Sequence, residues 1–473
     1  MAKKTKAILS LEAQRQHMQG LRDLSMPEFI PFKSDILNLF TGGVAFGGIT
    51  EIAGDPNLFK STISAEVIGA AIAMGAHVIV HDKERKLDES RFSTLGIHSA
   101  NKANTKFWYF AQDWPAYRLT IEQYFTDVLN LFTSIRHDDL QKVKRAFDSN
   151  IAIDEAYDYY RRYLPAAEAS KARTASRAKT LAARLTMPSM LRKQDRSYIL
   201  TVLDSTTATP ADEEAPDENG EVKKESKAVR ARVWSEQLRN MMWVDDCVAG
   251  LHVAQKRMHL NFGGNSYKKA AVTTAQEFHY NCRIMTVPMA GGKLTRNPED
   301  NTITIGSPSK VSVDNRRNQV GQIILAKINK SLKGVNTEVP LFMLAQTGTD
   351  VINSMWQFLV NSGAIKHHHQ GKYKFVHELF AKMWPNERFN PVTFIKFYQD
   401  EGQRLWHVLQ QYMHLMLTGR VPEEEKLPEA KIELPSPFDG KKPAKKTASK
   451  RGKAAPKSTK KKAAKKTSRK KKK

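Results

Sequence analysis

A nine-residue loop between an apolar run and a helical pattern constrains this chain more than any other feature. The run Ile49–Ala53 predicts a buried strand, and residues 61–74 have the pattern of a helix. The loop between them reads Gly54, Asp55, Pro56, Asn57, Leu58, Phe59, Lys60, Ser61 and Thr62. Its backbone N–H groups and the N-terminus of the helix can bind phosphate oxygens, so we predict a phosphate-binding site here.

The loop follows the pattern Gly-x-x-x-x-Gly-Lys-Ser/Thr except that Phe59 replaces the second glycine. In such a loop Lys60 lies against the β- and γ-phosphates of a nucleotide, and the Ser61 hydroxyl binds Mg²⁺. The alternative is a chance Lys-Ser-Thr at the start of an ordinary helix. Because phenylalanine tolerates positive φ poorly, we expect Phe59 to have negative φ and a ring turned away from the phosphates.

The rhythm of strands and helices predicts an α/β fold. Gly75 marks the end of the first helix, and the short apolar run His77–Val80 predicts a second buried, parallel strand. This order is a βαβ unit. Five further apolar runs extend the predicted sheet: Tyr198–Leu203, Gly250–Ala254, Cys282–Val287, Val320–Ile328 and Pro340–Leu344. We therefore expect a mostly parallel central sheet flanked by helices.

Composition divides the chain further. We expect a polar helical segment at 1–28, a core in two parts at 29–113 and 197–345, a helical insertion at 114–196, and a small, aromatic-rich helical domain at 346–420. Residues 421–440 form a Pro/Glu linker. Within the core, residues 206–226 predict an acidic loop, residues 230–242 a helix, and residues 261–274, rich in Gly, Ser and Lys, a mobile loop.

The charge is concentrated at the C-terminus. Residues 441–473 hold 18 Lys and Arg in 33 positions and no acid, and subtracting these charges from the net +26 leaves +8 for residues 1–440. Such a tail is expected to be disordered and drawn to polyphosphate, although a solubilising or localisation role is the alternative.

The basic N-terminus lacks an apolar block after it, which argues against a secretory signal, and no run predicts a membrane span. The two cysteines, Cys247 and Cys282, indicate neither disulfide nor zinc, so a cytoplasmic location fits.

Polar side chains follow three of the predicted strands. Asp204 ends the run Tyr198–Leu203, Glu84 follows His77–Val80, and Gln255 follows Gly250–Ala254. Open α/β sheets bind ligands at the carboxyl ends of their strands. There, Asp204 could hold Mg²⁺, Glu84 could polarise the attacking water, and Gln255 could contact the γ-phosphate. The alternatives are a strand-end cap, a surface charge cluster that includes Lys83, Arg85 and Lys86, and an ordinary polar strand end.

These motifs together resemble the RecA family of recombinases, and among them the phage UvsX type. The loop with Phe before Lys60 is similar to the UvsX form. The other similar stretches are Asp82-Lys83-Glu84…Leu87-Asp88…Leu95-Gly96-Ile97, Leu203-Asp204-Ser205, Arg232-Val-Trp-Ser235-Glu-Gln-Leu-Arg239, Ala254-Gln255-Lys256-Arg257-Met258 and Ile328-Asn329-Lys330-Ser331. The resemblance covers roughly residues 29–113 and 197–345.

The resemblance implies a P-loop ATPase core that uses ATP and Mg²⁺. It makes Glu84 the catalytic base, Gln255 the γ-phosphate sensor, and Lys330 a cation that reaches the ATP of a neighbouring subunit, with Lys60 on the phosphates. Ser61 and Asp204 hold the metal. Asp88 and Arg91 lie by the nucleotide, Arg91 standing where the family has an aromatic over the adenine. Arg232 and Arg239 lie on the helix after the first DNA loop.

The predicted loop 261–274 has its own signs of DNA binding. It combines Gly263-Gly264 with Tyr267, Lys268 and Lys269, and Arg257 and Met258 precede it. Cations follow phosphates, and an aromatic or thioether side chain can wedge between bases. A plain solvated loop is the alternative.

We therefore expect an ATP-dependent recombinase that forms filaments on single-stranded DNA and promotes homologous pairing and strand exchange. Its partners would be single- and double-stranded DNA, further copies of itself, and single-strand-binding and mediator proteins, with no membrane. It would act in the cytoplasm at the nucleoid, or in a host cell if the source is viral. The alternatives are a ring-forming DNA helicase of the same fold and a non-hydrolysing DNA-binding protein.

Overall fold

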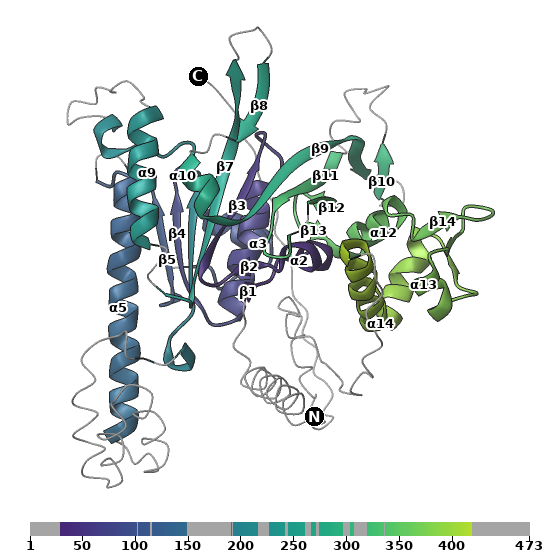
Figure 1. The fold of residues 1–473 in the computed structure, drawn as a ribbon, viewed down its shortest axis with the longest axis horizontal. Coiled ribbons are helices and arrows are strands. Elements are labelled where there is room, and N and C mark those ends of the chain that lie inside the picture. The colour runs from purple at the N-terminus through teal and green to yellow at the C-terminus, as the bar shows by residue number, and fades with distance from the viewer. Residues whose placement is uncertain are drawn as a thin grey trace, which may run out of the picture. The chain divides into compact units, whose positions relative to one another are not determined.

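A mixed sheet, eleven-stranded in the described part of the chain, forms the centre of this computed structural model (Figure 1). The structure describes residues 29–418 except 102, 114–115, 149–190, 192, 216–226, 242–244, 261–265, 271–273, 297–302, 307–318 and 335. The predicted segments 1–28, 421–440 and 441–473, and much of 114–196, therefore lie outside the described residues. The strands along the main path are, in spatial order, β13 (Gly348–Asp350), β12 (Thr337–Leu344), β11 (Gln319–Lys330), β9 (Tyr280–Arg296), β3 (Gly48–Gly54), β7 (Val248–Leu260), β6 (Ile199–Asp204), β4 (His77–Asp82) and β5 (Phe107–Ala111).

Strands β9, β3, β7, β6, β4 and β5 are all parallel, and β11, β12 and β13 continue the sheet antiparallel. Two further strands pair at its margins, β8 (Ser266–Ala270) with β7 and β10 (Ile303–Gly306) with β9. The prediction of an α/β fold with a mostly parallel sheet is confirmed at this level.

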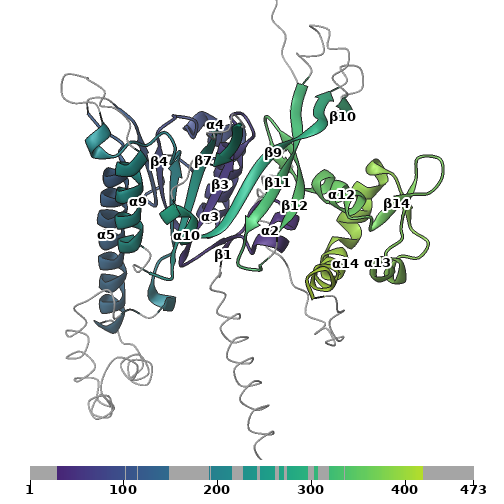
Figure 2. The ribbon, with the colours of Figure 1, turned by 45° about the horizontal axis from the view of Figure 1, so that its top comes forward.

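Helices bury both faces of the parallel strands. Along β4, Val78 and Val80 join the hydrophobic cluster that contains α3 (Lys60–Ala73) and α2 (Asp35–Thr41), whereas Ile79 joins the cluster that contains α5 (Ile121–Asp148) and α9 (Lys227–Met241). Figures 1 and 2 show α5 and α9 side by side. Because successive strand residues point to opposite faces, a strand buried on both sides is apolar throughout, as the sequence shows.

The strand β7 is much longer than the predicted run Gly250–Ala254. It continues beyond Gln255 by pairing with β8, with Lys256 opposite Ala270 and Leu260 opposite Ser266 (Figure 1). The prediction of a loop over 261–274 is therefore wrong for residues 266–270, which form a strand. Antiparallel pairing satisfies the backbone N–H and C=O groups whatever the side chains are, so the polar sequence of β8 did not reveal it.

The C-terminal part combines helices with a small sheet. Its elements are α12 (Val351–Asn361), β14 (Ile365–His367), β15 (Tyr373–Phe375), α13 (Glu378–Met383), β16 (Arg388–Phe389) and α14 (Pro391–Thr418). The three strands, which the sequence analysis did not predict, form an antiparallel sheet. Phe375, Phe380 and Phe394 belong to the same hydrophobic cluster as α2 and β12, and the Tyr398 hydroxyl donates to Asp35 at 2.7 Å.

The remaining elements are short. They are β1 (Phe29–Ile30), β2 (Val44–Ala45), α4 (Glu89–Thr94), α10 (Thr274–His279) and two 3₁₀ turns, Lys193–Asp195 and Asp212–Glu214. Both cysteines, Cys247 and Cys282, are buried and unbridged. Among the described helices, none combines the length and the apolar character that crossing a membrane requires.

Candidate functional site

The predicted phosphate loop joins the end of β3 to the start of α3. Gly54 has no room for a side chain, because a Cβ atom there would lie 2.0 Å from Oγ1 of Thr286 on β9. Asn57 and Phe59 both have left-handed backbone, with φ of 62° and 57°. Turns of this kind direct successive N–H groups inward and form anion-binding concavities. The backbone of the loop therefore suits a phosphate group.

The prediction of negative φ at Phe59 is wrong. The residue before the helix must take the left-handed conformation that glycine adopts freely, at a cost of about 1–2 kcal/mol for other residues. The Phe59 side chain is half-buried and packs against the hydrophobic cluster that includes α3. Burial of an aromatic ring contributes free energy of a similar size and can offset this cost.

Lys60 and Ser61 begin α3 and point to different partners. Lys60 is buried, and its Nζ donates to the carbonyl oxygen of Asp55 at 2.7 Å. Burial lowers the pKa of Lys60, and the charge of Lys86 lowers it further, against the opposing effect of Asp204. The Ser61 Oγ donates to Oδ2 of Asp204 at 2.6 Å. The structure thus brings the predicted metal ligands together.

Asp204 ends β6 in a buried position. Burial raises its pKa to about 7, a hydrogen bond from Ser61 opposes the rise, and the carboxylates of Asp82 and Glu84 add to it. A buried acid beside other acids is an environment in which a bound cation would be strongly favoured. The hydroxyl of Ser61 and the carboxylate of Asp204 are oxygen ligands of the kind that Mg²⁺ prefers, so the residues fit this ion.

Glu84 accepts hydrogen bonds from two neighbouring strand ends. Its Oε1 accepts from Gln255 Nε2 at 2.6 Å and from Oγ of Ser205 at 2.8 Å; a cis peptide bond joins Ser205 to Asp204. Its Oε2 pairs with Lys86. Burial alone would raise the pKa of Glu84, but the hydrogen bond and charge of Lys86, with Ser205 and Gln255, lower it below its usual value. Glu84 is therefore a carboxylate in this structure.

Asp82 shapes the turn that presents Glu84. Its Oδ1 accepts from the backbone N–H of Glu84 at 3.0 Å, and its Oδ2 accepts from the N–H of Leu87 at 2.6 Å and from the Tyr109 hydroxyl at 3.1 Å. Aspartate commonly organises turns by bonding to the backbone two residues on. Sequence analysis gave Asp82 no role, although its place two residues before Glu84 was a usable signal.

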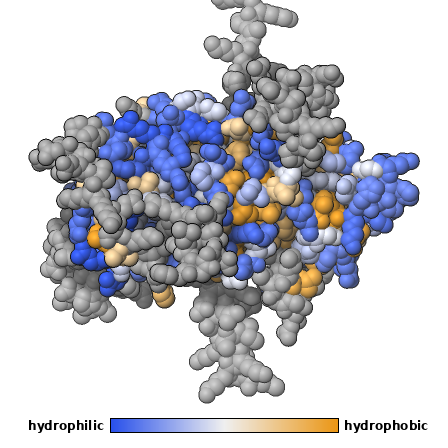
Figure 3. Space-filling view, turned by 90° about the horizontal axis from the view of Figure 1, so that it is seen from above, coloured by the Kyte–Doolittle hydropathy of each residue, from blue (hydrophilic) through white to orange (hydrophobic). Residues whose placement is uncertain are grey.

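The sheet register explains why these residues meet. Asp82 lies opposite Asp204, Asp204 opposite Val253, and Gly54 opposite Gln255. The backbone N–H of Gln255 also donates to Oγ1 of Thr207 at 2.8 Å. Figure 3 looks onto this edge, where hydrophilic side chains cover a broad area. The predicted phosphate loop, the predicted metal ligands, the predicted base Glu84 and the Gln255 amide thus lie along one edge of the sheet.

Asp88 and Arg91 lie beside the loop. Asp88 caps α4, with Oδ1 accepting from the N–H of Arg91 at 2.7 Å. The Arg91 guanidinium donates to Oγ1 of Thr62 and, at 2.8 Å, to the carbonyl oxygen of Ala345. Arg91 therefore joins the start of α3 to the end of β12.

Lys330 is not brought to the loop of its own chain. It lies at the end of antiparallel β11, opposite Arg283 of β9. The residue of β9 that lies opposite Gly54 is Thr286, three residues further along. Its Nζ donates to the carbonyl oxygens of Glu277 and Phe278, both at 3.3 Å. The action of Lys330 on a neighbouring subunit stays a prediction.

The predicted DNA-binding residues lie on α9 and on the β7–β8 hairpin. Arg232 is exposed and pairs with Glu213, and the exposed Arg239 donates to the carbonyl oxygen of Ser235 at 2.9 Å. In the hairpin the backbone pairs Arg257 with Lys269 and Met258 with Lys268. The structure does not describe these four side chains.

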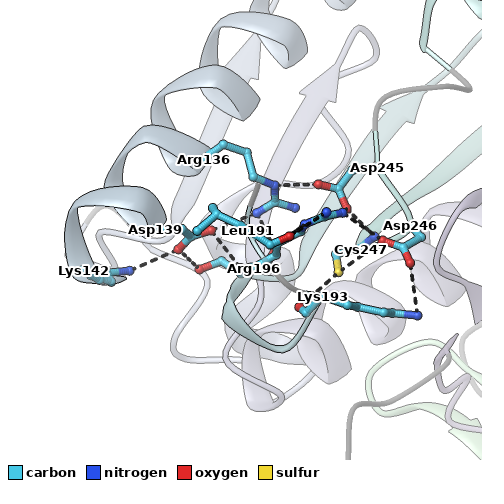
Figure 4. A network of polar contacts seen from close by, with 10 residues as sticks. Arg136, Asp139, Lys142, Leu191, Lys193, Arg196, Asp245, Asp246 and Cys247 are labelled. Carbon is cyan, nitrogen blue, oxygen red and sulfur yellow. Dashed lines mark hydrogen bonds and ion pairs between the residues drawn. The ribbon is translucent and has the colours of Figure 1, made fainter. Parts of the chain in front are cut away.

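A second polar cluster, which sequence analysis missed, lies away from this edge (Figure 4). The guanidinium of Arg136, on α5, donates to Asp139 at 2.9 Å and to Asp245 at 2.7 Å. Asp245, Asp246 and Cys247 lie close enough together to suggest a metal site. However, Arg196 pairs with both aspartates, so the chain itself supplies the positive charge.

Comparisons with known proteins gave no relative that could indicate a role for this site. A scan against protein-family models and a search of curated proteins gave no match. The fold, with helices on both faces of a mostly parallel sheet, is compatible with a P-loop-like core. Any function proposed for this chain therefore depends on the chemistry of the contacts at the sheet edge.

Proposed function

We propose that this chain is a DNA-dependent ATPase, a recombinase of the RecA type that assembles on single-stranded DNA and promotes pairing and strand exchange. One observation carries the ATPase part. The pair Ser61–Asp204 and the pair Glu84–Gln255 meet at the same sheet edge as the phosphate loop. Nucleotide hydrolysis needs a metal site, a base and a phosphate cradle side by side.

Each residue has a distinct task in this proposal. The loop and Lys60 bind the triphosphate, and Glu84 orients a water and accepts its proton as the water oxygen attacks the γ-phosphorus. The bond from that phosphorus to the bridging oxygen breaks, giving ADP and phosphate. Ser61 and Asp204 would hold Mg²⁺, which when bound would supply positive charge to the phosphate oxygens. Gln255, whose amide donates to Glu84, would also contact the terminal phosphate and so respond to its loss.

The strand β7 supports the link to DNA. Gln255 contacts Glu84, the proposed catalytic base. Arg257 and Met258 follow two and three residues later on the same strand, where it pairs with β8. A change at Gln255 can therefore reach the hairpin without passing through a flexible connection.

Self-assembly is supported by the surface around Lys330. Phe278, whose carbonyl oxygen accepts from Lys330, is 78% exposed, and Leu332 is 57% exposed. Aromatic residues such as phenylalanine are enriched at protein interfaces. A second copy seated here would cover these two side chains and could bring Lys330 to its nucleotide.

The test is ATP turnover by the full chain with and without single-stranded DNA. We expect DNA to raise turnover, and Lys60→Ala to lower kcat/KM by about 10²-fold or more, as removal of a charge-stabilising group does elsewhere. Lys106→Ala is the matched control, since Lys106 is exposed and bonds to the carbonyl oxygen of Gly75. Unchanged turnover in Lys60→Ala would show that the site is misassigned.

The same preparation separates the two alternatives. Ring-shaped particles that unwind duplex DNA would favour a helicase over a recombinase. Nucleotide binding without turnover, on DNA of any length, would favour a non-hydrolysing DNA-binding protein.

A further inference from the structure

Lys86 is a cation inside the candidate site to which the proposed function gives no task. It follows Glu84 by two residues in the turn that Asp82 holds, and its ammonium group pairs with Oε2 of Glu84. Sequence analysis named Lys86 only in the alternative to a base at Glu84, a surface charge cluster. The structure instead directs it at the predicted base.

The charges around Lys86 are those of the site itself. Its positive charge lowers the pKa of Lys60 and of Asp204, so its ammonium group is close enough to interact with both ends of the site. Burial would lower the pKa of Lys86, but Glu84, Asp204 and Asp82 together raise it. Lys86 therefore carries its charge at neutral pH. Its side chain is 47% exposed, which leaves it room to move.

Both oxygens of Glu84 are engaged. Oε1 accepts from Ser205 and Gln255, and Oε2 is paired with Lys86. An acid held in this way is a poor proton acceptor, because each of these contacts favours its charged form. Glu84 gains basicity when Lys86 leaves it.

We propose that Lys86 is a second phosphate-binding cation of this site, which moves from Glu84 to the terminal phosphate of the nucleotide and thereby frees Glu84 to accept a proton. This inference rests on the proposed function. A terminal phosphate carries about −1.5 to −2 charges near neutral pH, more than the single charge of a carboxylate, so it competes well for the ammonium group. ADP lacks that phosphate, so in its presence Lys86 stays on Glu84.

The neighbouring Arg85 provides a matched control. It lies in the same turn and carries the same charge, but its guanidinium donates to the carbonyl oxygen of Gln112 and lies 3.7 Å from Asp113. Its side chain is 62% exposed. Arg85 thus points away from Glu84, and a substitution there removes a charge without touching the site.

The experiment compares the full wild-type chain with Lys86→Met, Lys86→Arg and Arg85→Met. Binding of ADP and of a non-hydrolysable ATP analogue is measured by calorimetry, and kcat/KM for ATP is measured across pH. We expect Lys86→Met to weaken the analogue about tenfold or more, the usual effect of a lost charge-assisted hydrogen bond, and to leave ADP within about twofold. The acid limb of its kcat/KM profile should move to higher pH, because that profile reports the free enzyme, in which Glu84 loses the contact that lowers its pKa. Lys86→Arg and Arg85→Met should keep the wild-type preference.

Two results would overturn the inference. One is an equal effect of Lys86→Met on the analogue and on ADP, including no effect on either. The other is an acid limb that does not move. Wild-type protein that binds neither nucleotide would overturn the proposed function as well, so the two failures can be told apart.

Discussion

At the scale of single residues, Asp204 shows how a functional position can oppose stability. Its carboxyl group is buried near Asp82 and Glu84, and burial is the main cause of a pKa raised to about 7. A carboxyl group whose pKa is higher in the folded chain binds more protons there than in the unfolded chain. Stability is therefore fully present below the unfolded pKa and falls as pH rises through about 7. A bound cation removes this penalty.

We expect Asp204→Asn to stabilise the metal-free chain. The amide keeps an oxygen that can accept from Ser61, and it has no charge to bury. The gain in free energy of unfolding should be on the order of 2–4 kcal/mol at pH 8 and about half of that at pH 5. Urea unfolding at the two pH values, in the presence of a chelator, measures it. An equal gain in free energy of unfolding at pH 5 and at pH 8 would show that Asp204 does not titrate between these pH values. Turnover should be lost in the same variant.

At the scale of elements, the Arg136 cluster joins α5 to two distant segments (Figure 4). Asp139 accepts from Arg136 at 2.9 Å, and from the backbone N–H and the hydroxyl of Ser197 at 2.8 and 2.6 Å. Arg136 also reaches Asp245, next to the start of β7. These buried contacts fix α5 against the ends of two core strands, β6 and β7.

Asp139→Ala should destabilise the chain by about 3–5 kcal/mol, because it leaves buried donors of Arg136 and Ser197 without an acceptor. Asp139→Asn, which keeps an acceptor, should cost less. Asp138→Ala is the control on the exposed side of α5, and its effect should stay within about 0.5 kcal/mol. Chemical denaturation of the three variants gives the comparison. Equal effects of the substitutions at 138 and 139 would contradict a structural role for the cluster.

At the scale of the whole molecule, the proposal requires contact between copies. The exposed Phe278 and the adjacent Lys330 are the described residues that suit such a contact best. Lys330 lies opposite Arg283 of β9, three residues from the Thr286 that lies opposite Gly54, and its ammonium group bonds to carbonyl oxygens of α10, so the proposal assigns Lys330 to the nucleotide of a neighbouring copy. Turnover would then depend on assembly.

We therefore expect Phe278→Ser to reduce assembly on single-stranded DNA about tenfold or more and to reduce DNA-stimulated turnover with it. The fold should be unaffected, because the side chain is 78% exposed. Leu129→Ser is the matched control, since Leu129 is a 52% exposed apolar residue on α5. Sedimentation with an ATP analogue and DNA measures assembly. A Phe278→Ser variant that assembles as the wild type does would exclude this surface as the interface.

The parts that could be predicted from sequence are those with a strong periodic or positional signal. Glu84, Asp204 and Gln255 could be grouped because parallel strands place their carboxyl ends at one edge. Phe59 could not be predicted from conformational preference, since the packing of its ring overrides the local cost of its backbone. Lys86 was hidden by its charged neighbours, because the direction of each side chain depends on the turn that Asp82 holds.

In the proposed function, the unbroken course of β7 has a consequence for how DNA and nucleotide would influence each other. Leu260 lies five positions after Gln255, roughly 17 Å along one strand, and β8 pairs with this part of the strand. Equilibrium coupling between two binding sites is reciprocal. The factor by which bound ATP would raise the affinity for DNA therefore equals the factor by which bound DNA would raise the affinity for ATP. The proposal therefore predicts that a substitution in the β7–β8 hairpin changes the affinity for ATP and that one at Gln255 changes the affinity for DNA.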